Sequence, residues 1–151
     1  MELKFTVFAF VSRPAAEVYE AVADPELLSR YFTTGGVKGR LEAGATVSWD
    51  FHDFPGAFPV HVVEAEPERR IVLRWAANDA EAEGGYDTIV AFSFEPAGEG
   101  RTKVSVTEQG WRETASGLNA SYGNCMGWSQ MLAALKAWLE HGIVLREGMY
   151  V

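Results

Sequence analysis

Four side chains that could bind a metal ion lie close together in the sequence. Asp50, His52 and Asp53 are near neighbours, and His61 follows on the next predicted strand. Carboxylates and imidazoles are common ligands of zinc and related ions. Asp50 and His52 share one face of a strand, but nothing in the sequence fixes the register of His61 against them. Such groups on the polar face of a sheet are usually hydrated, so we predict no metal site and no cofactor.

The only cysteine, Cys125, is a candidate nucleophile. A catalytic thiol needs a base within hydrogen-bond reach, and His141 lies about four turns further along the same predicted helix. We therefore interpret Cys125 as a structural thiol. The sequence also lacks Gly-x-Ser-x-Gly, His-Glu-x-x-His, Gly-x-Gly-x-x-Gly and phosphate-loop motifs. We predict no catalytic residue.

Polar residues begin the last long apolar-periodic stretch: Asn119, Ser121, Tyr122 and Asn124. Gly123 and Gly127 flank Asn124, although a glycine inside a helix costs up to about 1 kcal/mol relative to alanine. The two glycines indicate either close approach of another group or a helix that frays or kinks before Cys125. That group would be a packed strand or a ligand. If it is a ligand, Asn124 and Tyr122 are its expected hydrogen-bonding partners.

The composition is that of a globular protein with an acidic surface. Of the 151 residues, 48% are hydrophobic and 23% are charged, and the net charge is −8. This charge repels phosphate backbones and anionic membranes, so we expect neither a nucleic-acid partner nor a membrane partner. One cysteine cannot form an intrachain disulfide, which agrees with a cytoplasmic location. The short apolar run after Glu2 does not resemble a signal peptide. We expect a single domain over residues 1–151.

The helices that must position these residues are indicated by apolar spacing. A long helix over residues 119–142 places one stripe toward a partner. The stripe consists of Asn124, Trp128, Met131, Leu132, Leu135, Trp138 and Leu139. Two short helices are predicted over residues 14–23 and 25–32, with Ser12 as the candidate N-cap of the first. They follow a predicted strand over residues 3–11.

A period of two residues then continues for most of the chain. It predicts strands over residues 37–41, 46–51, 58–66, 70–75, 86–95 and 102–110. The short connections favour an antiparallel meander. One face of these strands is aromatic and aliphatic, and the other carries polar residues such as Asp50 and His61. The sequence thus predicts an α+β fold, in which a curved antiparallel sheet of six to seven strands wraps around the long C-terminal helix.

Several short motifs follow one another along the chain: Pro14 with Val18-Tyr19, Asp24-Pro25-Glu26 with Tyr31-Phe32, Pro67 with Arg70 to Trp75, Gly100 to Val104 leading to Glu108-Gln109-Gly110, and Gly127-Trp128 with Leu132 and Leu135. In this order they resemble the Hsp90-ATPase-activator-homologue-like family of the START/Bet v 1 superfamily. The resemblance spans nearly the whole chain. It departs at Tyr31-Phe32, where the family usually has Trp-Phe, and at Gly44-Ala45, where it often has two glycines. The resemblance implies a helix-grip fold with a cavity for an apolar molecule.

A ligand in that cavity would contact the inward aromatic residues and the polar start of the long helix. The predicted binding residues are Trp49, Phe51, Phe58, Val60, Trp75, Tyr86, Phe92, Trp111, Tyr122, Asn124 and Trp128. The inward rings equally fit a packed core without any cavity.

Three functions follow from these observations. The first is binding of a small hydrophobic or aromatic molecule, lipid-like or polyketide-like. The second is an enzyme resembling polyketide cyclases and dehydratases, which would require an inward Asp or His. The third is activation of an Hsp90-type chaperone ATPase, as the resemblance implies. An edge strand could also pair two copies into a homodimer.

Overall fold

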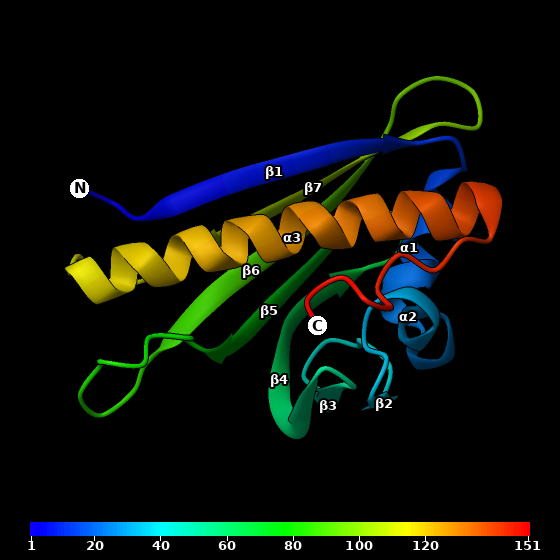
Figure 1. Ribbon diagram of the computed structural model, residues 1–151. Helices are drawn as coiled ribbons and strands as arrows, with labels where there is room; N and C mark the ends of the chain where they lie inside the picture. Colours follow the sequence, from blue (N-terminus) through cyan, green and yellow to red (C-terminus); the bar gives the residue numbers. More distant parts are fainter.

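A seven-stranded antiparallel sheet curves around one long helix in the computed structural model, which describes residues 1–151 (Figure 1). The helices are α1 (Ala15–Ala23), α2 (Pro25–Tyr31) and α3 (Ala115–His141). The strands are β1 (Lys4–Val11), β2 (Gly36–Lys38), β3 (Thr46–Phe51), β4 (Phe54–Glu66), β5 (Arg70–Ala76), β6 (Asp87–Pro96) and β7 (Thr102–Gln109). The spatial order is β1-β7-β6-β5-β4-β3-β2. The predicted helix-grip fold is confirmed.

The sheet buries the face that the alternation predicts. Its concave side carries fully or almost fully buried apolar residues on five strands: Val47, Trp49, Val60, Val62, Ile71, Leu73, Val90, Phe92, Phe94, Val104 and Val106. Successive side chains on a strand point to opposite faces, so one register error would expose a whole row. The register is therefore fixed by burial of this face.

Helix α3 lies across the concave side of the sheet (Figure 1). Its buried positions Trp128, Met131, Leu132 and Leu135 belong to the predicted stripe. Trp138 stacks on Tyr31 of α2 with 5.5 Å between ring centroids. None of the helices is both long enough and apolar enough to cross a membrane.

The ends of the helices differ from the sequence prediction. Ser12 does not cap α1, whose N-cap is Pro14 without a side-chain hydrogen bond. The Ser12 amide instead donates to Glu140 Oε2 at 3.0 Å, which ties the end of α3 to the loop after β1. Helix α3 begins at Ala115 and not at residue 119, because the Thr114 hydroxyl accepts a hydrogen bond from the Gly117 amide and so caps an extra turn.

The hairpin between β3 and β4 is tighter than predicted. Strand β4 begins at Phe54 and not at residue 58, because Phe54 already pairs with Phe51. Asp50 Oδ1 accepts a hydrogen bond from the Gly56 amide at 3.0 Å and supports this turn. The hairpin therefore carries Phe51 and Phe54 to one end of the concave face.

Two glycines of α3 provide a test of this packing. A Cβ on Gly117 would lie 2.1 Å from the Arg112 carbonyl oxygen, whereas a Cβ on Gly127 would meet nothing within 4 Å. We expect Gly117→Ala to lower the free energy of unfolding, since backbone must move. We expect Gly127→Ala to raise it by up to about 1 kcal/mol, since alanine favours a helix. Urea denaturation followed by tryptophan fluorescence measures both, and equal effects of the two substitutions would contradict this account.

Candidate functional site

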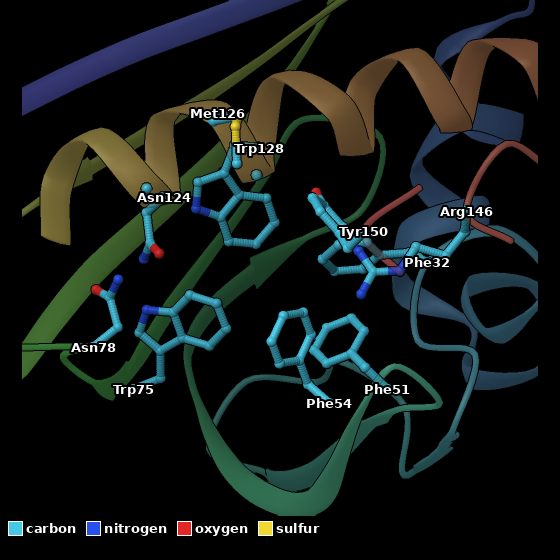
Figure 2. A pocket seen from close by; sticks show the side chains of 12 residues that line it. Phe32, Phe51, Phe54, Trp75, Asn78, Asn124, Met126, Trp128, Arg146 and Tyr150 are labelled. Atoms are coloured by element: carbon cyan, nitrogen blue, oxygen red, sulfur yellow. The ribbon is translucent and has the colours of Figure 1, made fainter. Parts of the chain in front are cut away.

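A pocket of about 470 Å³ opens between the N-terminal half of α3, the ends of β3 to β5 and the C-terminal segment. Figure 2 shows its lining side chains converging from these elements. The lining residues are Phe32, Phe51, Phe54, Trp75, Asn78, Gly123, Asn124, Met126, Gly127, Trp128, Arg146 and Tyr150. The hollow of the sheet is thus packed toward the C-terminal half of α3 and open toward its N-terminal half.

Aromatic rings form most of the pocket wall. Trp128 lies next to Trp75 and Phe32, with ring centroids 5.5 Å and 5.6 Å away. Phe32 also meets Phe51 edge to face at 5.1 Å. Such contacts hold the rings in place, each pair contributing about 0.5–1.5 kcal/mol beyond area burial. The wall is consequently apolar and rigid.

The two glycines of α3 explain why the pocket is not filled. Gly123 and Gly127 are one helical turn apart, and both line the pocket. A Cβ on Gly127 would find open space, and a Cβ on Gly123 would have only the Asn78 amide nitrogen as a neighbour, at 4.0 Å. Neither glycine has a positive φ. These positions therefore lack side chains where a side chain would occupy the pocket, and no strand packs closely against them.

A fully buried carboxylate lies directly behind this wall. Glu108 is 0% exposed and accepts hydrogen bonds from four side chains. They are Trp75 Nε1 at 3.0 Å, Thr88 Oγ1 at 2.7 Å, Asn124 Nδ2 at 3.0 and 3.1 Å, and Trp128 Nε1 at 2.7 Å. Three of the four donors line the pocket. The carboxylate thus fixes the orientation of the two indoles and one amide.

The site prediction missed Glu108, as well as the lining residues Phe32, Phe54, Asn78, Met126, Arg146 and Tyr150. Glu108 is the last member of the inward row of β7, after Thr102, Val104 and Val106, and all four are buried. The alternation of β7 therefore contains the signal, because it places a carboxylate where an apolar residue is expected. Charged residues are almost never fully buried without hydrogen-bonding partners, so an inward Glu108 predicts polar donors on the elements that face β7.

The C-terminal segment covers one end of the pocket. Arg146 Nη2 donates to Asp53 Oδ1 at 2.7 Å, and the two side chains are only 7% and 1% exposed. The guanidinium lies over the rings of Phe51 and Tyr150, 4.8 and 4.6 Å from their centroids. Burial raises the pKa of the Tyr150 phenol above its ordinary value of 10.0, against the opposing charge of Arg146. The phenol is therefore neutral at neutral pH.

The predicted binding residues fall into three groups. Phe51, Trp75, Asn124 and Trp128 line the pocket. Trp49, Phe58, Val60 and Phe92 belong to the adjoining core or pack against it. Tyr86, Trp111 and Tyr122 lie outside the lining.

Each residue of the third group has a different environment. The Tyr86 hydroxyl donates to Asp79 at 2.6 Å, and Trp111 Nε1 donates to Asn78 Oδ1 at 3.2 Å. Tyr122 is 64% exposed. On α3, Tyr122 is two residues from Asn124, or about 200°, so the two side chains lie on opposite faces and could not share a pocket.

The metal-ligand candidates are dispersed. His61 Nδ1 is within 3.0 Å of the Thr46 hydroxyl, and His52 contacts Thr34. Asp53 is paired with Arg146. No group of three or more His, Cys, Asp and Glu side chains is arranged to hold a metal ion. Cys125 is a free thiol of intermediate exposure.

Comparison with known families gives a match over most of the chain. Residues 12–140 match the family described as Activator of Hsp90 ATPase homolog 1-like protein. The chain belongs to this family. Among curated proteins, none matches the sequence.

Solved structures share the fold. SSP2350 from Staphylococcus saprophyticus is 24% identical, with a TM-score of 0.78 over 95% of this chain and 96% of that chain. The Aha1 dimer from Colwellia psychrerythraea is 24% identical, with a TM-score of 0.73 over 92% and 96%. DynU16, a protein in the dynemicin biosynthetic locus, is 26% identical, with a TM-score of 0.75. The alignment covers 92% of this chain and 48% of DynU16.

The family match covers most of the pocket lining, but not the residues after position 140. Glu108 and all lining residues of α3 fall within residues 12–140, which the Activator of Hsp90 ATPase homolog 1-like family describes. Arg146 and Tyr150 lie beyond them. The wall next to Glu108 therefore belongs to the part that matches the family, and the end that Arg146 and Tyr150 cover belongs to the segment after it.

The buried carboxylate should carry much of the stability of this region. Glu108→Ala leaves four donors without an acceptor, so we expect the free energy of unfolding to fall by about 3–5 kcal/mol. Glu95→Ala, on the exposed face of β6, is the matched control and should change it by less than about 0.5 kcal/mol. Urea denaturation measures both. A loss below about 1 kcal/mol for Glu108→Ala would show that the hydrogen bonds to Glu108 contribute little.

The ion pair between Asp53 and Arg146 should hold the C-terminal segment in place. Asp53→Asn removes the charge opposite Arg146, and an unpaired buried guanidinium is strongly unfavourable. We expect trypsin to cleave after Arg146 at least tenfold faster in this variant, which mass spectrometry detects as loss of residues 147–151. Glu66→Gln, which breaks the exposed pair with Arg69, should leave that rate unchanged. Equal cleavage after Arg146 in all three proteins would mean that the ion pair does not hold the segment.

Proposed function

We propose that this protein binds a small apolar molecule with aromatic or lipid-like character in the pocket under α3. The observation that carries the proposal is a cavity of about 470 Å³ whose wall contains six aromatic rings. They are Phe32, Phe51, Phe54, Trp75, Trp128 and Tyr150. This volume lies within the range of small-molecule sites, which are typically apolar with few polar groups.

The surroundings of the pocket support this proposal. Few polar side chains reach the lining, and Asn78, Asn124 and Arg146 are already hydrogen-bonded within the protein. Because the rings are held in place and Gly123 and Gly127 have no side chains to fill the space, the cavity is present before any ligand binds. A pocket formed in advance saves the ligand the cost of ordering it. The structural likeness to a protein in a biosynthetic locus is compatible with a lipid-like or polyketide-like ligand.

The enzyme alternative requires an inward group that can transfer a proton. The structure contains an inward carboxylate, Glu108, but it is not part of the pocket lining. Both of its oxygens already accept hydrogen bonds, including one from each indole. A general acid or base must reach its substrate directly or through one water. The carboxylate is therefore placed to orient the wall, and ligand binding is the better-supported function.

The chaperone alternative has a different basis. The family description and the likeness to the Aha1 dimer favour it, whereas the pocket does not bear on it. Activation of an Hsp90-type ATPase therefore stays a prediction of the family resemblance. Pairing of two copies into a homodimer likewise stays a prediction.

Titration of a ligand panel tests the binding proposal. The panel contains a medium-chain fatty acid, a flavonoid and a hydroxylated anthraquinone, and calorimetry with tryptophan fluorescence gives the affinities. We expect at least one class to bind and to perturb Trp75 and Trp128. Gly127→Leu fills the pocket from α3, so it should weaken that binding at least tenfold.

Ser129→Leu is the matched control, since it places the same side chain on the exposed face of α3. Its affinity should equal that of the unmodified protein. Absence of binding across the panel, or equal affinities for the Gly127→Leu and Ser129→Leu variants, would remove the pocket as the binding site. Thermal denaturation of both variants shows whether they are folded.

A further inference from the structure

We infer that the end of the pocket next to Glu108 selects a neutral aromatic ligand carrying a hydroxyl group, and that this hydroxyl donates a hydrogen bond to Asn124 Oδ1. The inference rests on the proposed function and adds to it the polarity and orientation of the ligand. It follows from the direction of the hydrogen bonds around Glu108.

The indole N–H groups of the pocket wall already donate to the buried carboxylate, so they are not available to a ligand. Each indole has a single N–H and no acceptor. Trp75 Nε1 and Trp128 Nε1 both donate that hydrogen to Glu108, one to each carboxylate oxygen. Their rings line the pocket, but their polar atoms are turned to the carboxylate behind it. A ligand acceptor, such as a carboxylate or an ether oxygen, finds neither indole free to bind it.

Asn124 presents the complementary group. Its Nδ2 donates to both oxygens of Glu108, and a carboxylate can only accept, so the orientation of the amide is settled. The remaining atom, Oδ1, accepts no hydrogen bond in the protein and is not among the buried polar atoms without a partner. It is therefore accessible in the pocket that Asn124 lines (Figure 2). An accessible amide oxygen among rings is an acceptor for a hydroxyl group.

The charges at the two ends of the pocket disfavour an anion. Glu108 takes part in none of the ion pairs of the protein, so its charge is balanced by hydrogen-bond dipoles and by no cation. At the opposite end, the charge of Arg146 is already paired with that of Asp53. An anionic ligand would thus meet the Glu108 carboxylate behind one end of the pocket and no free cation at the other. A neutral phenol avoids both costs.

Three naphthalenes with one substituent each test the inference in the unmodified protein. They are 2-naphthol, 2-methoxynaphthalene and 2-naphthoate, and binding is followed at neutral pH by the indole N–H signals of ¹⁵N-labelled protein. We expect 2-naphthol to bind at least fivefold more tightly than 2-methoxynaphthalene, although the ether is the more apolar molecule. The anion 2-naphthoate should bind more weakly than both.

Asn124→Leu should abolish the preference for the hydroxyl group. In this variant the affinity ratio of 2-naphthol to 2-methoxynaphthalene should fall to about one or below, while the ether still binds. Ser129→Ala, on the exposed face of the same helix, should keep the ratio of the unmodified protein. If Asn124→Leu does not fold, the comparison of the three ligands in the unmodified protein decides the inference alone.

The outcomes separate this inference from the proposed function. Equal affinities for 2-naphthol and its methyl ether in the unmodified protein would overturn the inference and leave the pocket as a binding site. If 2-naphthoate binds most tightly of the three, and Arg146→Met abolishes this binding, the inference is overturned in favour of an anion site at Arg146. If neither the naphthalenes nor any member of the ligand panel binds, both the inference and the proposed function are overturned.

Discussion

The structure of the site depends on one buried charge. The Glu108 carboxylate joins β7 to Trp75 on β5, Thr88 on β6, and Asn124 and Trp128 on α3. An ionised group buried without a cation is tolerated only when hydrogen bonds replace its hydration shell, and this requirement fixes all four donors at once. Apolar packing is less directional than hydrogen bonds, which require each donor at a specific position. The carboxylate specifies one position of the helix along the sheet.

With that position fixed, α3 serves two purposes along its length. Its C-terminal half packs Met131, Leu132 and Leu135 into the sheet and completes the core. Its N-terminal half has Gly123 and Gly127 on the side that lines the pocket, and so leaves a gap. The gap does not collapse because its walls are held from outside, by hydrogen bonds to the carboxylate on one side and by ring contacts on the other. A cavity without such support would shrink as its walls relaxed.

The sequence predicted the fold well and the site in part, for physical reasons. The alternation on five strands and the helical stripe are imposed by burial, so both can be recognised without coordinates. Tyr122 was expected in the pocket because it precedes Gly123, which does line it, but adjacent side chains on a helix point about 100° apart. Glu108 was missed because a carboxylate in the inward row of β7 contradicts the apolar pattern by which inward residues are recognised. Arg146 and Tyr150 follow the last helix in a segment without periodicity, and only its fold back over Phe51 brings them to the pocket.

The polarity of the pocket follows from how its two charged groups are neutralised. The Glu108 carboxylate is balanced by donors taken from the pocket wall, and this leaves the wall next to it with ring faces and the accepting oxygen of Asn124. The Arg146 guanidinium is balanced by a carboxylate from the β3–β4 turn, so it covers rings as a planar apolar surface as well as a cation. Each charge thus has its counterpart within the chain, although Asp53 Oδ2 and Arg146 Nε are buried without a hydrogen-bond partner. The selectivity of the pocket then depends on shape and on the direction of hydrogen bonds more than on attraction between opposite charges.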